Sequence, residues 1–157
     1  MNNLVSDVAQ RLILNQEMLA VAESCTGGWL AKVCTDMAGS STWFERGFVT
    51  YSNEAKYEML GVSLESINTY GAVSQQTVEA MVTGALSHSH ANWAIAISGV
   101  AGPNGGTEVN PVGSVWFAWM KKNQQAVTSK QLFSGDRNQV RQQSVEFALE
   151  QLFKLLK

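Results

Sequence analysis

The sequence predicts an α/β fold in three layers, with helices on both faces of a mixed sheet of about five strands. Two observations lead to this prediction. Between residues 3 and 98, short apolar runs alternate with segments whose apolar residues recur at helical spacing, a pattern typical of parallel strands joined by helices. Between residues 114 and 133, two apolar runs flank the polar stretch KKNQQ, as in an antiparallel hairpin. We expect a single domain over residues 1–157, because a chain of this length buries a sufficient core.

The first three elements are a helix, a strand and a second helix. Residues 3–15 repeat apolar side chains at helical spacing and are expected to form an amphipathic helix. The run MLAVAE, residues 18–23, is short and apolar, as expected of a buried strand. Gly27 and Gly28 then open a second helix, which we expect to reach about Ala38.

The middle of the chain adds a strand and two helices. RGFVTY, residues 46–51, is predicted to be a strand, and NEAKYEML after it a helix. Ser52 or Asn53 can cap this helix, and Gly61 can close it. Another helix is expected over residues 74–87, with a serine as its cap.

The last part of the chain completes the sheet. WAIAIS, residues 93–98, is predicted to be a third buried strand. SVWFAWM (114–120) and AVTSKQLF (126–133) are expected to pair as the antiparallel hairpin. A final helix is expected from about Asp136 to the end of the sequence.

Composition and charge argue against several classes of protein. The net charge is −2 and the isoelectric point is about 5.6, whereas a nucleic-acid-binding protein usually presents a basic face. No apolar run approaches the ~20 residues of a membrane span, and the first residues lack the pattern of a signal peptide. Cys25 and Cys34 lack CxxC spacing and suit a reducing compartment. We therefore expect a cytoplasmic protein with neither a nucleic-acid nor a membrane partner.

A ligand site is expected where the parallel strands end. In folds of this kind ligands bind beyond the carboxyl ends of the strands, which here means the loops after Glu23, Tyr51 and Ser98. The loop SGVAGPNGGTEVNPVG, residues 98–113, is dense in glycine and holds both prolines of the chain. Glycine permits close approach of the backbone, so such a loop can direct several N–H groups at one anion. A loop of this length in a small domain is usually functional.

The glycine spacing of this loop matches neither the P-loop nor the dinucleotide-binding pattern, so no triphosphate or dinucleotide site is predicted. We instead expect its backbone to contact a small anionic ligand. The candidate binding residues of the loop are Gly99, Gly102, Gly105, Gly106 and Thr107.

Ser24 is the candidate nucleophile. It follows a predicted strand and precedes a glycine-opened helix, whose first N–H groups and positive dipole end suit an oxyanion or phosphate. Thr26, Gly27 and Gly28 are therefore candidate binding residues. The alternative is structural, with Ser24 or Thr26 only capping the helix, and the stretch alone favours neither interpretation. Cys25 is the rival nucleophile, although a buried cysteine is commonly a small apolar side chain.

A serine nucleophile needs a base, and neither histidine is placed to serve. His88 and His90 lie at the end of a predicted helix, away from the glycine loop, and without a third ligand they do not predict a metal site. Lys56 is the better candidate. It falls in the first turn of a helix, where the dipole disfavours a cation, and partial burial would lower its pKa further. Tyr51 ends the preceding strand, and the same connection supplies Asn53 as a candidate binding residue.

Two arginines are candidate phosphate ligands. Arg137 and Arg141 lie four residues apart on one face of the predicted last helix, within the most basic part of the chain. Such a pair can hold a phosphate, although on most helices it is simply solvated.

Four stretches together resemble the CinA C-terminal-domain family, whose stand-alone members include nicotinamide-nucleotide amidases. These stretches span nearly the whole chain in the order typical of the family. They are AESCTGGWLAKVCTDMAGSSTWFERGFVTYSNEAK (22–56), GAVSQQTVEAM (71–81), ISGVAGPNGGTEVNPVGSVWFAW (97–119) and FSGDRNQVR (133–141). One position departs from the family pattern: Asn110 stands where a lysine is common before Pro-Val-Gly.

The resemblance implies hydrolysis of the carboxamide of nicotinamide mononucleotide, giving nicotinic acid mononucleotide and ammonia. It implies Ser24 as nucleophile with Tyr51 and Lys56 close by, and no cofactor. Residues 1–157 would then be one CinA C-terminal-like amidase domain, and we expect it to form a homo-oligomer, most simply a dimer. The alternative is a regulatory module that binds a nucleotide in the same pocket without turnover.

Overall fold

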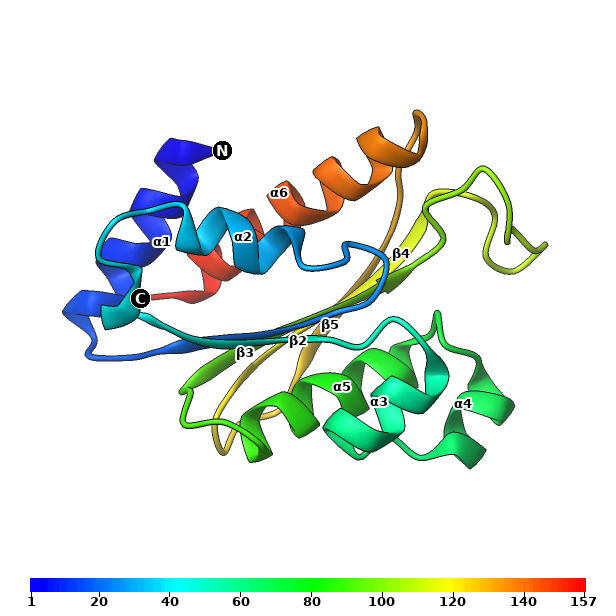
Figure 1. The fold of residues 1–157 in the computed structure, drawn as a ribbon, viewed down its shortest axis with the longest axis horizontal. Helices are drawn as coiled ribbons and strands as arrows, with labels where there is room; N and C mark the ends of the chain where they lie inside the picture. Colours follow the sequence, from blue (N-terminus) through cyan, green and yellow to red (C-terminus); the bar gives the residue numbers. More distant parts are fainter.

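The protein is a three-layer α/β/α domain, described by a computed structural model of all 157 residues, Met1 to Lys157. Figure 1 shows the sheet between two layers of helices. The strands are β1 (Leu19–Glu23), β2 (Phe44–Val49), β3 (Trp93–Gly99), β4 (Ser114–Lys121) and β5 (Val127–Leu132). The helices are α1 (Asn2–Leu14), α2 (Trp29–Thr35), α3 (Asn53–Leu60), α4 (Leu64–Tyr70), α5 (Gln75–Ser87) and α6 (Arg137–Leu155), with a short 3₁₀ turn η1 (Ser40–Thr42).

The sheet is mixed, and its strand order is β2-β1-β3-β4-β5. Strand β1 pairs in parallel with both β2 and β3, whereas β4 runs antiparallel to both β3 and β5. The predicted fold class, with five strands and a terminal hairpin, is confirmed. The parallel strands β1, β2 and β3 end at one edge of the molecule, where the loops that follow them meet.

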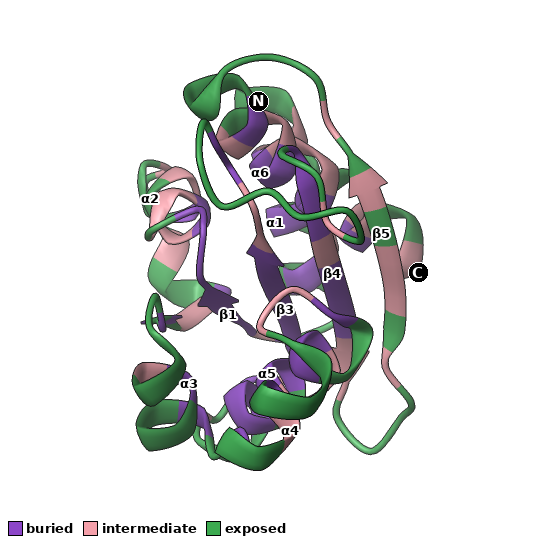
Figure 2. Cartoon of the chain, turned by 90° about the vertical axis from the view of Figure 1, so that its right-hand side faces the viewer, coloured by how far each residue is buried: buried purple, intermediate pink, exposed green.

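Each face of the sheet has its own apolar core. Helices α1, α2 and α6 cover one face and α3, α4 and α5 the other (Figure 1). Val21 points into the first core, and its neighbours Ala20 and Ala22 into the second, because side chains alternate along a strand. Figure 2 shows the central strands buried and the edge strand β5 partly exposed. Burial on both faces explains why β1 and β3 are continuous apolar runs in the sequence.

The helices near the site begin and end at capping residues, largely as predicted. Ser52 accepts a hydrogen bond from the Ala55 amide and caps α3, which ends at Gly61 with a φ of 71°. Ser74 caps α5 in the same way. Asp136 forms a capping box with Gln139 at the start of α6. These caps fix the first turns of α3 and α6, which carry the candidate site residues Asn53, Lys56 and Arg137.

Three elements differ from the prediction. Helix α2 begins at Trp29, two residues later than expected, because Gly27 and Gly28 both adopt positive φ angles and form a tight turn. Helix α2 also ends at Thr35, before the predicted Ala38. Helix α4 was not predicted, because it is only 7 residues long and its one buried residue, Ile67, creates no apolar period. The strand predicted over 46–51 lies at Phe44–Val49.

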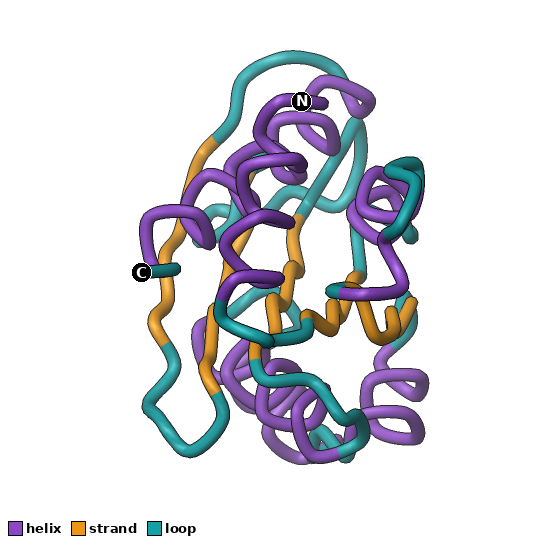
Figure 3. The backbone as a smooth tube through the Cα atoms, turned by 90° about the vertical axis from the view of Figure 1, so that its left-hand side faces the viewer, coloured by secondary structure: helices purple, strands orange, loops and turns teal.

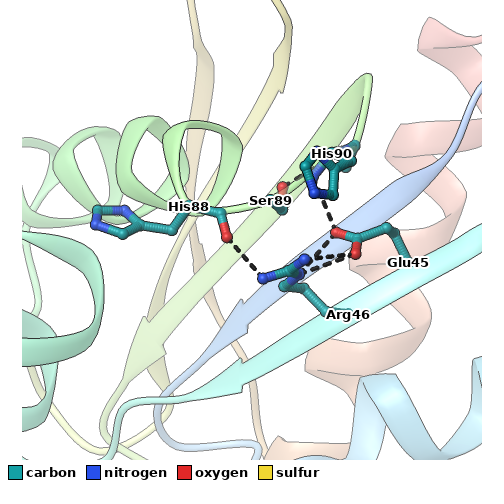
Figure 4. Close-up of polar contacts among 6 residues, drawn as sticks. Glu45, Arg46, His88, Ser89 and His90 are labelled. Carbon is teal, nitrogen blue, oxygen red and sulfur yellow. Dashed lines mark hydrogen bonds and ion pairs between the residues drawn. The ribbon is translucent and has the colours of Figure 1, made fainter.

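The edge strand β2 is fastened to the connection between α5 and β3. Figure 4 shows the Glu45 carboxylate accepting hydrogen bonds from the Arg46 guanidinium and from the backbone amide of His90. Arg46 also donates to the carbonyl of His88 at 2.9 Å. His88 and His90 are exposed and lie before β3, whereas Ser24 lies at the carboxyl end of the strands. They are therefore remote from the candidate nucleophile.

Figure 3, which views the molecule from the side opposite to that of Figure 2, also shows helices above and below the strands. None of them is both long and apolar enough to cross a membrane.

Candidate active site

Ser24 lies in the first turn after the central strand β1. Its amide donates to the carbonyl of Ile97 on β3 at 3.0 Å, which fixes the backbone on which the hydroxyl stands. The side chain is 7% exposed and lines a cavity of about 280 Å³. The nucleophile predicted from the sequence is thus accessible from a pocket and held by the sheet.

Lys56 reaches Ser24 from the first turn of α3, across 32 residues of sequence. The Lys56 Nζ atom lies 3.0 Å from Ser24 Oγ, 2.8 Å from the Thr50 carbonyl oxygen and 3.3 Å from the Tyr51 carbonyl oxygen. The side chain is 1% exposed, and no carboxylate pairs with it. Burial lowers the pKa of Lys56 from 10.5 to about 8.

This geometry suits a neutral amine that accepts the serine proton. A neutral lysine has two N–H donors and one lone pair. The two peptide oxygens of Thr50 and Tyr51 can take the two N–H groups, which leaves the lone pair directed at Ser24 Oγ. Because the pKa of Lys56 lies near 8, roughly a tenth of the lysine is neutral at pH 7.

Cys25 also lines the cavity beside Ser24, but its thiol is poorly suited to act as a nucleophile. Burial raises the pKa of its thiol to about 11, and the Glu23 carboxylate adds to the rise, so the thiol stays protonated near neutral pH. The side chain belongs to the apolar core shared with α1, α2 and α6. Ser24 is therefore the better-placed nucleophile of the two neighbours.

The cavity gathers eight of the fourteen residues proposed from the sequence. Those that line it are Ser24, Tyr51, Asn53, Lys56, Gly99, Gly102, Gly105 and Arg137. Those that do not line it are Thr26, Gly27, Gly28, Gly106, Thr107 and Arg141. Sequence reasoning missed Ala72 and Val73, which lie between α4 and α5, together with Ser98, Val100, Ala101 and Asn104. Because α4 was not predicted, nothing in the sequence pattern placed Ala72 and Val73 beside the glycine loop.

The two arginines play different parts. Arg137 is exposed at the first turn of α6, where it donates to the Gly102 carbonyl at 2.8 Å and lies 3.4 Å from the Tyr51 hydroxyl. Arg141 points behind the nucleophile turn and donates to the carbonyls of Cys25 and Thr26 at 3.0 and 3.1 Å. The guanidinium of Arg141 is thereby committed to the backbone, whereas that of Arg137 faces the cavity.

The phenol of Tyr51 lies against Arg137 rather than Lys56. The Tyr51 side chain is 63% exposed, and only its carbonyl oxygen contacts the amine of Lys56. The backbone of Tyr51 thus contacts the Lys56 amine, while its side chain lies beside Arg137 at the mouth of the cavity.

The start of α2 is already occupied by a protein group. The Glu23 carboxylate accepts hydrogen bonds from the amides of Leu30 and Ala31, at 2.9 and 3.0 Å. The N-cap position is Gly28, and no side chain caps the helix from there. The structural alternative for Ser24 and Thr26, that either caps α2, is therefore wrong. The only sequence signal for Glu23 was a charged residue at the end of an otherwise apolar strand.

The glycine loop supplies N–H groups that have no partner in the chain. The amides of Ala101, Gly102, Asn104 and Gly105 donate to no group of the chain, and all four residues line the cavity. Gly102 and Gly105 have φ angles of 83° and 88°, which few other residues adopt. Such a row of amides beside an arginine is suited to an anion.

Side chains anchor the loop to the connection before α5. Ser98 Oγ donates to the Ala72 carbonyl at 2.8 Å, and the Asn110 amide donates to the Val73 carbonyl at 3.0 Å. Thr107 is used within the loop, since its hydroxyl accepts a hydrogen bond from the Asn110 backbone amide. Ser98, at the start of the loop, and Asn110, near its end, thus both hold the loop to the Ala72–Val73 connection.

The chain is similar to proteins of one family over nearly its whole length. Residues 1–156 match the family described as the CinA C-terminal domain. The chain is 52% identical, over 96% of its length and 92% of the relative, to the nicotinamide-nucleotide amidohydrolase PncC of Escherichia coli strain K12. It is 44% identical, over 98% and 89%, to protein YdeJ of the same strain. It also superposes, with a TM-score of 0.94 and 40% identity over 98% and 94%, on the crystal structure of the competence damage-inducible protein A of Klebsiella pneumoniae. The chain therefore belongs to the CinA C-terminal-domain family.

Proposed function

We propose that this chain is a nicotinamide-nucleotide amidohydrolase, which converts nicotinamide mononucleotide and water to nicotinic acid mononucleotide and ammonia. The observation that carries the proposal is the buried contact of 3.0 Å between the Lys56 amine and the Ser24 hydroxyl, with the pKa of Lys56 lowered to about 8. The resemblance to PncC over nearly the full length of both chains supports the choice of substrate.

The reaction proceeds through an ester on Ser24. The Ser24 oxygen attacks the carboxamide carbon while its proton passes to the neutral Lys56 amine. Lys56 then returns the proton to the amide nitrogen, and the carbon–nitrogen bond breaks to release ammonia. A water molecule attacks the resulting ester, again with Lys56 taking the proton, and Ser24 leaves with that proton restored. The product is the free carboxylate.

The oxyanion and the substrate phosphate draw on different donors. Because Glu23 occupies the amides of Leu30 and Ala31, the first turn of α2 is not free to bind the oxyanion. The amides of residues 101–105 that have no partner in the chain are the main donors to the oxyanion instead. The phosphate binds to Arg137 at the mouth of the cavity, where a charge-assisted hydrogen bond to the guanidinium anchors the nucleotide.

The test is ammonia release by the purified protein without added metal. We expect turnover of nicotinamide mononucleotide and little turnover of free nicotinamide, which lacks the phosphate. Ser24→Ala should abolish turnover and leave the fold intact, whereas Cys25→Ala should keep most of the activity. The reverse pattern would make the enzyme a thiol amidase and refute the serine mechanism.

The second candidate function is a regulatory module that binds a nucleotide without hydrolysing it. The similarity to protein YdeJ, which bears a different name from PncC at comparable identity, keeps this candidate in view. Binding of nicotinamide mononucleotide without ammonia release by the wild-type protein would favour it. A binding module has no need of the buried lysine beside the serine.

The working state of the enzyme completes the proposal. We propose that it acts in the cytoplasm, where the free thiols of Cys25 and Cys34 stay reduced, and as a dimer. Light scattering on the purified protein measures the oligomeric state, and a monomer at assay concentration would refute the dimer.

A further inference from the structure

Glu23 is a buried carboxylate for which the reaction itself has no use. It is the last residue of β1, the strand next to Ser24, and it is fully buried. No lysine, arginine or histidine pairs with it. A buried charge without a cation is costly unless hydrogen bonds and a dipole compensate it. Because Glu23 directly precedes Ser24, this buried carboxylate can serve the geometry of the site.

The carboxylate closes a loop around the nucleophile. Its two oxygens accept from Leu30 and Ala31, the second and third residues of α2, so residues 24–29 lie between Glu23 and the groups that it binds. These two amides belong to the first turn of the helix, where they have no partner within the helix itself. The positive end of the helix dipole stabilises the charge. Glu23 thus holds the turn that carries Ser24 against the start of α2.

The backbone of Glu23 ties the same turn to the lysine. The Glu23 carbonyl accepts a hydrogen bond from the Thr50 amide at 2.8 Å, and the Thr50 carbonyl in turn accepts from Lys56 Nζ at 2.8 Å. The side chain of Glu23 therefore holds the turn that carries Ser24. Its main chain holds Thr50, whose carbonyl oxygen binds the Lys56 amine.

We propose that Glu23 is a positioning residue: by binding the Leu30 and Ala31 amides it holds Ser24 Oγ within reach of Lys56. This inference rests on the proposed amidase function. The distance from Ser24 to Lys56 depends on the path of residues 24–28, which contain two glycines at positive φ and no side-chain cap. A displacement of about 1 Å in a reacting group lowers a rate by roughly 100-fold.

The test compares two isosteric substitutions at buried carboxylates, one beside Ser24 and one remote from it. Glu23→Gln keeps the shape but presents an NH₂ group to one of the two amides, so one hydrogen bond is lost. Glu17→Gln is the matched control: Glu17 is 9% exposed, binds Trp93 Nε1 at 3.0 Å and Lys121 at 2.6 Å, and lies before β1, at its other end. Both variants should lower the Tm.

We expect Glu23→Gln to lower kcat for nicotinamide mononucleotide by about 30- to 100-fold with KM within about 2-fold, because Arg137 and the glycine loop are untouched. Glu17→Gln should keep the wild-type kcat at temperatures where it is folded. The basic limb of the pH profile should stay in place in both. If Glu23→Gln does not fold, Glu23→Asp, which withdraws the carboxylate by one methylene, should show the same loss confined to kcat.

Three results would overturn the proposal. An active wild type with an unchanged kcat in the folded Glu23 variant removes the positioning role alone. A pH profile displaced in Glu23→Gln shows that the residue acts on the titration of Lys56 rather than on the position of Ser24. A wild type that releases no ammonia refutes the amidase function, and the positioning role falls with it.

Discussion

At the scale of single residues, the decisive contact joins a serine to a lysine whose amine is held by peptide oxygens. Sequence reasoning placed Ser24 and Lys56 correctly in one cavity, because the loops after parallel strands converge at their carboxyl ends. It could not tell which of Arg137 and Arg141 binds the phosphate. Helical spacing shows that two residues share a face, but not how far each lies from the sheet edge. It missed Glu23, because a strand pattern does not reveal that a terminal carboxylate turns back onto the next helix.

The lysine predicts a pH dependence. The pKa of Lys56 is about 8, so the pH profile of kcat/KM should rise through a limb near that pH as the amine loses its proton. Lys56→Met should remove the limb and lower the rate by about 10²–10⁴-fold, the usual range for a positioned base. Lys56→Arg should not restore activity, because a guanidinium stays protonated. Near-normal turnover by Lys56→Met would exclude the lysine as base.

The two arginines predict opposite kinds of defect. Arg137→Ala removes the guanidinium that faces the cavity and should raise KM for the nucleotide, with a loss of about 1.5–3 kcal/mol in binding. Arg141→Ala leaves the Cys25 and Thr26 carbonyls without their donor and should mainly lower the Tm. Steady-state kinetics and thermal unfolding on the same preparations separate the two. A KM defect confined to Arg141→Ala would move the phosphate site behind the turn.

At the scale of elements, alternating pattern was enough for the strands and for the long helices, and it failed where the structure is short. Helix α4 has one buried residue, and the start of α2 is set by two glycines in a conformation that propensity does not foresee. Both failures lie at the rim of the cavity. The Ala72–Val73 connection that follows α4 forms a cavity wall, and the turn before α2 carries Ser24.

The junction between β3 and the glycine loop predicts a steric defect. A Cβ atom on Gly99 would lie 2.7 Å from Val115 Cγ2 and 2.8 Å from the Ser114 oxygen, so β4 would have to shift. Gly99→Ala should destabilise the protein by about 1–3 kcal/mol and also lower kcat/KM, because the loop amides move with the strand. Gly39→Ala is the control, with strain at a φ of 83° but open space around the added atom. It should lose stability and keep kcat/KM.

At the scale of the whole molecule, the fold class follows from the sequence because each level of pattern agrees: buried runs for the central strands, amphipathic helices for the two outer layers, and a hairpin for the antiparallel edge. What the sequence pattern does not contain is the distance between elements. The 3.0 Å contact between residues 24 and 56 emerges only when β1, β2 and α3 are packed together.

The buried lysine also predicts how global stability varies with pH. The unfolded chain binds a proton at Lys56 up to pH 10.5, whereas the folded protein releases it near pH 8. The unfolded state therefore binds more protons between these two pH values, and stability rises with pH across that window. Relative to Lys56→Met, the wild type should gain up to roughly 3 kcal/mol from pH 8 to 10.5. Denaturant unfolding at several pH values measures it, and parallel curves for the two proteins would contradict it.

The cradle of Lys56 has a consequence for how the site tolerates sequence drift. Its two acceptors are main-chain oxygens of residues 50 and 51, and every amino acid carries such an oxygen. Divergence of those two side chains therefore leaves the amine anchored as long as the chain keeps its path between β2 and α3. The position of the Lys56 amine thus depends on the path of the backbone rather than on the side chains of residues 50 and 51. Substitutions at Thr50 and Tyr51 should therefore leave both main-chain acceptors of the Lys56 amine in place.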